Sequence, residues 1–252
     1  MRKKIVAANW KMNLTLAQGE KLVNELLQAG IALDAHKEVV IAVPFPYLIT
    51  VKELLKGHKG FYVAAQNVAA EKAGAFTGEV NAEMLHSIHT DYVIIGHSER
   101  RELFHESNAT LAKKMDLALS HGLKPIFCCG EPLDVRKAET QNAFVAKQLE
   151  ESLFHLSPDQ LKHVVVAYEP IWAIGTGLTA SAAQAQDMHA FIRKQVAGRY
   201  GEAVANDLTI LYGGSVKAAN ATEIFAGADV DGGLVGGASL VAAEFAAIAK
   251  AI

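Results

Sequence analysis

Short apolar runs recur at regular intervals along the whole chain of 252 residues, and this recurrence constrains the fold more than any other feature. The runs are rich in β-branched residues and almost continuously hydrophobic, which is typical of strands buried on both faces of a parallel sheet. They occupy residues 5–10, 38–43, 61–66, 92–95, 125–128, 164–168, 208–212 and 230–235. We therefore predict eight buried, parallel strands.

Amphipathic helical patterns lie between these runs. In residues 16–29, Leu22, Val23 and Leu26 share one stripe, and Glu20 and Lys21 lie outside it. Similar patterns occupy residues 109–119, 144–154 and 182–196. Strand–helix units of about 30 residues predict an α/β fold, a single (β/α)₈ barrel whose parallel eight-stranded sheet is closed and ringed by helices. An open, doubly wound sheet fits less well, because no dinucleotide fingerprint follows the first strand.

Composition limits the class of protein. The formal charge of −3 leaves no overall basic field that would indicate nucleic acid or an anionic membrane as a partner. We recognise neither a secretory signal nor an apolar run that could span a bilayer. The only cysteines, Cys128 and Cys129, are adjacent and are interpreted as thiols in a reducing compartment. We expect one catalytic domain over residues 1–252, located in the cytoplasm, with no nucleic-acid or membrane partner.

Polar residues follow several predicted strands, at the end of the barrel where active sites lie. Asn9 and Lys11 end the first strand and point the same way, so they either bind a carbonyl oxygen and an anion or form a solvated strand end. His97 follows the fourth strand and begins a polar helical turn, whose N–H groups favour a neutral imidazole. Such a ring can donate to a carbonyl and relay a proton, but a structural role for His97 is also compatible with its position.

Glu169 stands at the tip of the apolar sixth strand and is followed by the apolar segment PIWAI. An apolar cover raises the pKa of a carboxylate toward that of a useful general base. Residues 169–180 have proline near one end and two glycines, which is typical of a lid and also of an ordinary surface loop.

Glycine-rich stretches follow the seventh strand and coincide with the eighth, at residues 212–215 and 232–239. They either expose backbone N–H groups to a phosphate or serve only as turns. His86 and His89 are three residues apart, but no further ligand cluster completes a metal site, so we expect no metal. Residues 67–80 form a long loop of the kind that is usually functional or interfacial.

Together these motifs resemble the triosephosphate isomerase family. The matching segments are NWK at 9–11, TGE at 77–79, GHSERR at 96–101, CGE at 129–131, YEPIWAIGTG at 168–177, YGGS at 212–215 and LVGGASL at 234–240. The resemblance implies a TIM barrel that interconverts D-glyceraldehyde 3-phosphate and dihydroxyacetone phosphate in glycolysis and gluconeogenesis. It also implies general acid/base proton transfer through an enediolate, a phosphorylated triose as substrate, and no cofactor.

The resemblance further implies roles for individual residues. The reacting groups would be Glu169 as general base, His97 as electrophile and proton relay, Lys11 as the cation facing developing negative charge, and Asn9 as a ligand of the substrate oxygens. The phosphate would be bound by backbone N–H groups of Gly175, Ser215, Gly236 and Gly237. Supporting roles would fall to Ser98 and Glu99, to Ile174 and Leu234 against the Glu169 carboxylate, to Tyr212 and Ser215 as a lid latch, and to Thr77, which would enter the partner's active site in a homodimer.

Two other functions remain compatible with a barrel. A Schiff-base aldolase would use Lys11 as its nucleophile, although no desolvating cluster is evident around Lys11. A non-catalytic phosphate-binding barrel is the other, but such a protein has no reason to place Glu169 under an apolar lid. Leu178, Ala182 and Val241 stand where Lys, Pro and Lys are frequent in the family, which leaves lid stiffness and surface charge open.

Overall fold

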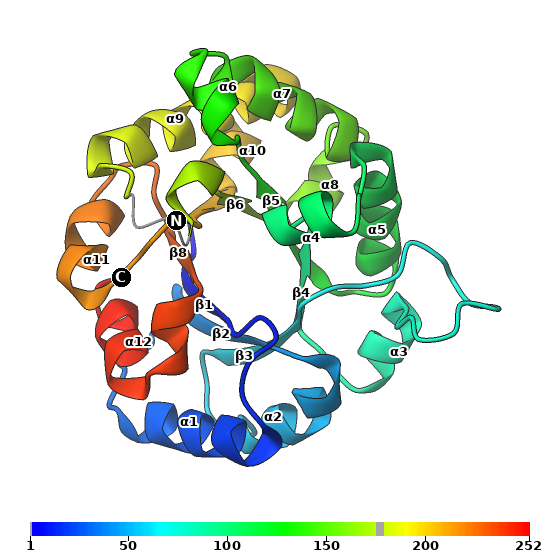
Figure 1. Cartoon of the computed structure of the whole chain (residues 1–252), viewed down its shortest axis with the longest axis vertical. Coiled ribbons are helices and arrows are strands. Elements are labelled where there is room, and N and C mark those ends of the chain that lie inside the picture. The colour runs from blue at the N-terminus through cyan, green and yellow to red at the C-terminus, as the bar shows by residue number, and fades with distance from the viewer. Residues whose placement is uncertain (1, 175–178) are drawn as a thin grey trace.

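The computed structural model describes residues 2–174 and 179–252, and within them eight parallel strands close into a barrel (Figure 1). Strand order follows the chain, and β1 pairs with both β2 and β8. The strands are β1 (Lys4–Asn9), β2 (Lys37–Val43), β3 (Phe61–Ala65), β4 (Tyr92–Ile95), β5 (Lys124–Cys129), β6 (Val165–Tyr168), β7 (Thr209–Tyr212) and β8 (Gly232–Val235). The predicted (β/α)₈ fold is confirmed.

The predicted strands differ from the observed ones only at their ends. The first ends at Asn9, because Lys11 adopts a left-handed φ of 54° and so leaves the extended conformation. The last begins at Gly232, whose φ is 123°. A Cβ on Gly232 would lie 2.0 Å from the Ile5 carbonyl oxygen, so only glycine lets β8 approach β1 this closely.

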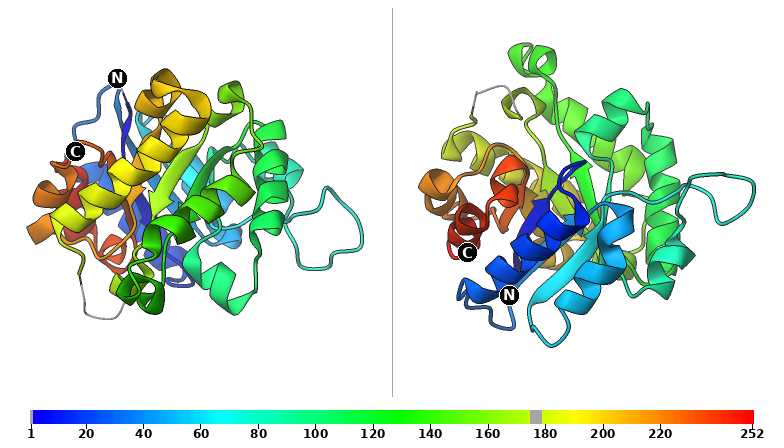
Figure 2. Two further views of the ribbon diagram at one scale, coloured as in Figure 1. Left: turned by 90° about the horizontal axis from the view of Figure 1, so that it is seen from above. Right: turned by 60° about the horizontal axis from the view of Figure 1, so that its bottom comes forward.

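Helices surround the barrel on its outside (Figures 1 and 2). They are α1 (Leu16–Gln28), α2 (Leu48–Leu54), α3 (Ala82–Ser87), α4 (Ser98–Leu103), α5 (Asn108–Ser120), α6 (Leu133–Lys137), α7 (Gln141–Ser152), α8 (Pro158–Leu161), α9 (Ala182–Tyr200), α10 (Glu202–Asp207), α11 (Ala218–Phe225) and α12 (Ala242–Ala249). Short 3₁₀ helices are η1 (Phe45–Tyr47), η2 (Ile171–Ala173) and η3 (Gly237–Leu240). The four amphipathic ranges correspond to α1, α5, α7 and α9. The longest of these, α9, is capped by Ser181, whose hydroxyl accepts the Gln184 N–H, and ends before Gly201.

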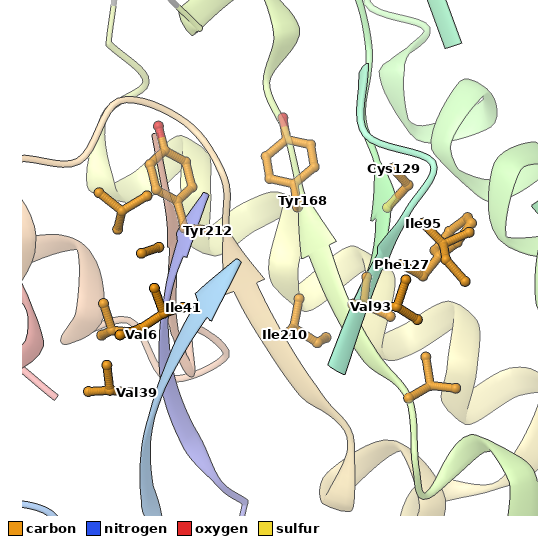
Figure 3. Packing of buried hydrophobic residues seen from close by; sticks show 14 of the residues in the cluster. Val6, Val39, Ile41, Val93, Ile95, Phe127, Cys129, Tyr168, Ile210 and Tyr212 are labelled. Carbon is orange, nitrogen blue, oxygen red and sulfur yellow. The ribbon is translucent and has the colours of Figure 1, made fainter. Parts of the chain in front are cut away.

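Side chains of the strands alternate between two apolar cores. Outward-pointing residues pack against the helices, as Figure 3 shows for Val6, Ile41, Val93 and Tyr168 among others. Inward-pointing residues fill the barrel and are Ile5, Ala7, Val40, Ala42, Ala64, Tyr92, Ile94, Ile126, Cys128, Val165, Ala167, Leu211 and Leu234. The next inward positions along β1 and β6 are Asn9 and Glu169, so the alternation itself aims both into the barrel at its carboxyl end.

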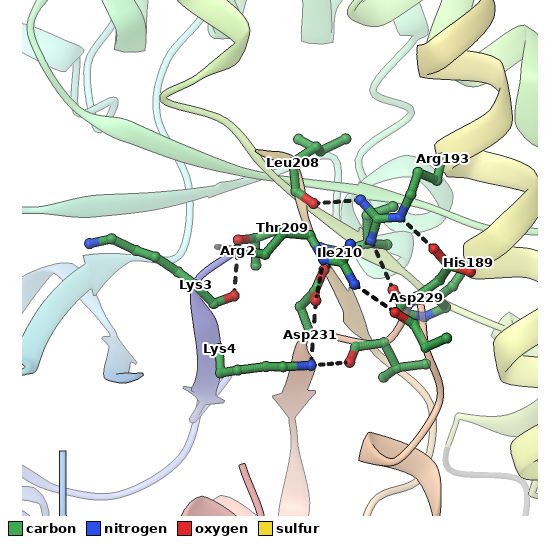
Figure 4. A network of polar contacts seen from close by, with 12 residues as sticks. Arg2, Lys3, Lys4, His189, Arg193, Leu208, Thr209, Ile210, Asp229 and Asp231 are labelled. Atoms are coloured by element: carbon green, nitrogen blue, oxygen red, sulfur yellow. Dashed lines mark hydrogen bonds and ion pairs between the residues drawn. The ribbon is translucent and has the colours of Figure 1, made fainter. Parts of the chain in front are cut away.

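A buried ionic network lies at the amino-terminal ends of β1, β7 and β8 (Figure 4). Arg193 of α9 pairs with Asp229 at 2.5 Å and Asp231 at 3.0 Å. Arg2 donates to the same Asp231 at 2.8 Å. Because each carboxylate is paired with charged donors, the network offers no free reactive group at this end of the barrel.

The connection between β3 and α3 extends away from the barrel, as the cyan loop of Figures 1 and 2 shows. Residues 71–79 of this loop are all exposed. Among the described residues, no helix has both the length and the apolar character needed to cross a membrane.

Candidate active site

A cavity of about 280 Å³ lies at the carboxyl ends of the strands. Nine of the residues expected from the sequence line it, namely Asn9, Lys11, His97, Glu169, Ile174, Ser215, Leu234, Gly236 and Gly237. Gly213, Gly214 and Ala238, from the two predicted glycine-rich stretches, line it as well, and the sequence analysis missed only Val216 and Lys217 among the lining residues. Segments from both ends of the chain therefore meet at one opening, although Gly175 lies outside the described residues.

Glu169 and His97, which both line this cavity, are in direct contact. Glu169 Oε1 lies 3.0 Å from His97 Nε2, and Glu169 Oε2 accepts the backbone N–H of Ser98 at 2.9 Å. Glu169 is only 2% exposed and His97 only 6% exposed. The carboxylate is therefore removed from water but fixed by two donors.

The pKa of Glu169 reflects this contact. Burial raises its pKa, but the imidazole of His97 and the Ser98 N–H lower it by more, so that the pKa lies below its ordinary value. The expectation that an apolar cover would raise the pKa is wrong for this conformation. Both oxygens of Glu169 have found donors that stabilise the charged form.

The imidazole of His97 is oriented by the first turn of α4. Its Nδ1 accepts the Glu99 backbone N–H at 3.3 Å, which leaves Nε2 as the protonated nitrogen of a neutral ring. Burial lowers the pKa of His97, but Glu169 and then Glu99 raise it by more, so that it lies above its ordinary value. The expected lowering of the His97 pKa is therefore not found while Glu169 lies against the ring.

Lys11 is held in its unusual backbone conformation by two side-chain amides. Asn9 Oδ1 accepts the Lys11 N–H at 3.1 Å, and Gln66 Nε2 donates to the Lys11 carbonyl at 3.0 Å. The Lys11 ammonium pairs with Glu99 Oε1 at 2.5 Å. Gln66 was missed in the sequence, although it is an amide at a strand end just as Asn9 is.

Two glycines leave the space that Glu169 occupies. A Cβ on Gly130 would lie 1.7 Å from the Glu169 carbonyl oxygen, and one on Gly213 would lie 2.9 Å from Glu169 Cγ. Gly130 follows β5 and Gly213 follows β7, on either side of the strand that carries Glu169. These glycines are required by close packing around the carboxylate side chain and backbone.

The start of the expected lid is tied to a buried carboxylate. Glu131 is completely buried and accepts hydrogen bonds from Tyr168 Oη at 3.0 Å and from Trp172 Nε1 at 2.9 Å. Burial raises the pKa of Glu131 despite these donors. The CGE motif contains Glu131, but the sequence analysis gave this residue no role.

One further lid contact comes from the segment after β7. Ser215 Oγ donates to the Ala173 carbonyl at 2.7 Å. Tyr212 does not line the cavity; it is buried, and a Cβ on Gly214 would lie 2.2 Å from its hydroxyl oxygen. Thr77 lies on the extended loop after β3 and is not among the residues lining the cavity of its own chain.

Two glycines line the cavity after β8. Gly236 connects β8 to η3, and Gly237 is the first residue of η3. A Cβ on Gly237 would meet nothing within 4 Å, and one on Gly236 would meet only Lys11 Cε at 3.6 Å. Among the described residues, no group of three or more His, Cys, Asp or Glu side chains is arranged to hold a metal ion.

Comparison with known proteins identifies close relatives along the whole length. Residues 4–252 match the family model described as Triosephosphate isomerase. The chain is 53% identical over 253 residues to the triosephosphate isomerase of Cytophaga hutchinsonii, with 99% of each chain covered. It is 51% identical to that of Porphyromonas gingivalis with both chains fully covered, and 49% identical to that of Clostridium novyi with 98% of each covered.

Proposed function

Because the chain belongs to the triosephosphate isomerase family and so interconverts D-glyceraldehyde 3-phosphate and dihydroxyacetone phosphate, a step of glycolysis, we propose that Glu169, His97 and Lys11 perform this reaction. One observation carries the assignment. A buried carboxylate contacts a buried imidazole in a cavity that an ammonium group also lines. These are a base, a hydrogen-bond donor and a positive charge, the groups that enolisation requires.

Glu169 acts as the general base in this proposal. It removes the proton from the carbon next to the carbonyl and returns it to the neighbouring carbon of the enediolate. To do so, it first leaves His97, because the Nε2–H of His97 must donate to the substrate oxygen instead. Once away from His97 and Ser98, and beside Ile174 and Leu234, the carboxylate loses the donors that lower its pKa and becomes a stronger base.

His97 and Lys11 stabilise the negative oxygen of the enediolate. The Glu99 N–H fixes Nδ1 as an acceptor, so the neutral ring presents its proton at Nε2. When Glu169 moves away, the main group that raises the His97 pKa moves too, which favours the neutral ring. Asn9 positions the substrate oxygens, and Lys11 supplies a fixed positive charge.

The phosphate of the substrate is held by backbone N–H groups of Ser215, Gly236 and Gly237, together with Gly175. This group lies away from the reacting carbons, so its binding energy is available to close the lid. Ser215 and Tyr212 latch the closed lid. Exclusion of water protects the enediolate from losing its phosphate.

The active species in this proposal is a homodimer in which Thr77 enters the partner's active site. Support comes from large apolar side chains that are exposed in the single chain, with Met12 at 95% and Phe104 at 62%, and Phe76 at 47% near Thr77 on the extended loop. We further propose that residues 1–252 act as one catalytic domain in the cytoplasm. Two free, buried cysteines support a reducing compartment.

A coupled assay tests the function, with dihydroxyacetone phosphate formation followed through its reduction by NADH. The purified protein is expected to isomerise D-glyceraldehyde 3-phosphate with unchanged activity after dialysis against a chelator. Borohydride added with dihydroxyacetone phosphate is expected to leave Lys11 unmodified. A covalent adduct on Lys11 would contradict the proposal and favour an aldolase. Absence of both isomerisation and an adduct would contradict it and favour the non-catalytic barrel.

A further inference from the structure

Arg101, the last residue of the GHSERR motif, donates hydrogen bonds to three separate parts of the barrel. Its Nε donates to the Gly96 carbonyl at 2.8 Å, its Nη2 to the Cys128 carbonyl at 2.9 Å, and its Nη1 to Asn108 Oδ1 at 2.6 Å. All three acceptors are neutral. Within residues 2–174 and 179–252, Arg101 forms no ion pair with a carboxylate.

The two carbonyls belong to the backbone that carries the reacting residues. Gly96 directly precedes His97. Cys128 directly precedes Cys129, whose carbonyl accepts the backbone N–H of Glu169 at 2.7 Å. The guanidinium therefore connects the residue before His97 to β5, the strand whose last carbonyl accepts the Glu169 N–H.

Arg101 extends the pairing of β4 with β5 beyond the end of the ladder. The ladder ends at the pair Ile95 and Phe127, and the next residues, Gly96 and Cys128, both present carbonyl oxygens to Arg101. Two carbonyls cannot bond to each other, so a donor between them is needed to keep the strand ends together.

The site around Gly96 is closely packed. Gly96 has a φ of 78°, and a Cβ on it would lie 3.2 Å from both Arg101 Nη2 and the Cys128 carbonyl oxygen, and 2.9 Å from Leu111 Cδ1. A displaced guanidinium would therefore move the turn that leads into His97. The planar fork of arginine suits this position, because lysine presents a single ammonium that cannot span two separated carbonyls in fixed geometry.

We propose that Arg101 is a positioning residue for the isomerase reaction: its guanidinium fork fixes Gly96 against Cys128 and thereby sets the position of the His97 imidazole relative to Glu169. This inference rests on the proposed roles of His97 and Glu169. It adds a residue that touches neither substrate nor reacting atoms but controls the geometry of those that do.

The test compares Arg101→Lys, which keeps the charge and removes the fork, with Arg199→Lys as a matched control. Arg199 also donates from Nη2 to a carbonyl, that of Phe154 at 3.1 Å, but lies at the end of α9 outside the cavity. For Arg101→Lys we expect kcat to fall about 10- to 100-fold, the effect of misplacing a reacting group by about 1 Å, with KM changed less than about threefold. The imidazole nitrogen resonances of His97 should shift. Arg199→Lys should keep both kcat and the resonances.

Several outcomes would overturn the proposal. Wild-type kcat in folded Arg101→Lys would show that charge alone suffices, and a lower melting temperature with unchanged kcat and His97 resonances would show a merely structural role. If Arg101→Lys does not fold, Asn108→Ala decides, because it removes one acceptor and leaves the guanidinium. It should lower kcat and shift His97 in the same direction, and an unchanged kcat would contradict the proposal. Glu169→Gln in the same assay distinguishes failure of this inference from failure of the proposed function. A wild-type kcat in Glu169→Gln would refute the proposed function, whereas the Arg101 and Asn108 variants test the positioning role of Arg101.

Discussion

The carboxylate of Glu169 occupies space that its neighbouring strands leave free through glycine. Gly213 faces Glu169 Cγ, and Gly130 faces the Glu169 carbonyl. Neither glycine forms a hydrogen bond with Glu169 at these contacts. The two glycines therefore influence activity only through the space that they leave for Glu169. The position of the Glu169 carboxylate therefore depends on the missing Cβ atoms of Gly130 and Gly213 as well as on its hydrogen-bond donors.

Gly213→Ala tests this dependence. The new Cβ would lie 2.9 Å from Glu169 Cγ and 3.1 Å from the Tyr168 carbonyl oxygen, so Glu169 must shift. We expect kcat to fall about 10- to 100-fold because the base is misplaced. Gly198→Ala is the control, since a Cβ there meets nothing within 4 Å and α9 should gain about 0.5–1 kcal/mol. Equal kcat values in both variants would refute the steric argument.

The sequence predicts where the site residues lie better than it predicts their pKa values. Alternation along β1 and β6 is enough to aim Asn9 and Glu169 into the barrel. The lowered pKa of Glu169 could not be predicted, because it depends on His97 and Ser98, which lie between β4 and the first turn of α4 and approach Glu169 only in the folded barrel. The same contact reverses the expected pKa shift of His97.

Among the elements, η2 lies between the base and the rest of the lid. It is held by side chains of the segment that follows β5. Trp172 donates to Glu131, which follows β5, and Arg136 of α6 lies 5.5 Å from the centre of the Trp172 ring. Tyr168 donates to the same carboxylate from the strand below. The first part of the lid is therefore anchored before any ligand binds.

Trp172→Phe tests the strength of this anchor. It removes one hydrogen bond to Glu131, and we expect amide exchange across residues 171–174 to accelerate about fivefold, which corresponds to roughly 1 kcal/mol. Trp10→Phe is the control, because the buried Trp10 Nε1 has no hydrogen-bond partner among the described residues. Unchanged exchange in Trp172→Phe, measured without ligand, would mean that Glu131 does not anchor η2.

The sequence was sufficient for the strands and the longer amphipathic helices but not for the short ones. Continuous apolar runs identify buried strands, and a stripe of apolar residues identifies α1. By contrast, α4 spans only Ser98–Leu103, too short for a helical period to be distinguished from chance. Such a helix depends on its contacts, here the His97 imidazole that accepts the Glu99 N–H, and these are set by the barrel.

At the scale of the whole molecule, a buried histidine outside the reacting groups couples stability to pH. His189 is completely buried, and burial lowers its pKa from 6.5 to about 4. Its ring stands edge-on to Tyr168 at 5.9 Å between ring centres. Between these two pKa values the unfolded chain binds the proton and the folded chain does not, so stability rises with pH across this window.

The His189 contribution should therefore be fully present above about pH 6.5 and decrease as pH falls toward 4, by an amount on the order of 3 kcal/mol per chain. Guanidinium unfolding at pH 7.5 and pH 5 measures the loss. His189→Gln, which cannot take up this proton, should lose less stability between the two pH values than the wild type. An equal loss in both proteins would assign the pH dependence to other groups.

Oligomeric state is also a property of the whole molecule. Sedimentation at assay concentration should give about twice the chain mass of 27.0 kDa. Thr77→Arg places a long charged side chain on the extended loop, and we expect it to dissociate the dimer and lower kcat. A wild-type protein that is fully active as a monomer would contradict the proposed dimer.

The central claim, that Glu169 moves the proton, is tested most directly by kcat of Glu169→Gln. The amide keeps the shape of the side chain and its packing between Gly130 and Gly213, so the circular dichroism spectrum should match that of the wild type. Because the amide cannot accept the proton, we expect kcat to fall by a factor on the order of 10²–10⁴ or more. A folded Glu169→Gln protein that keeps most of its kcat would contradict the account.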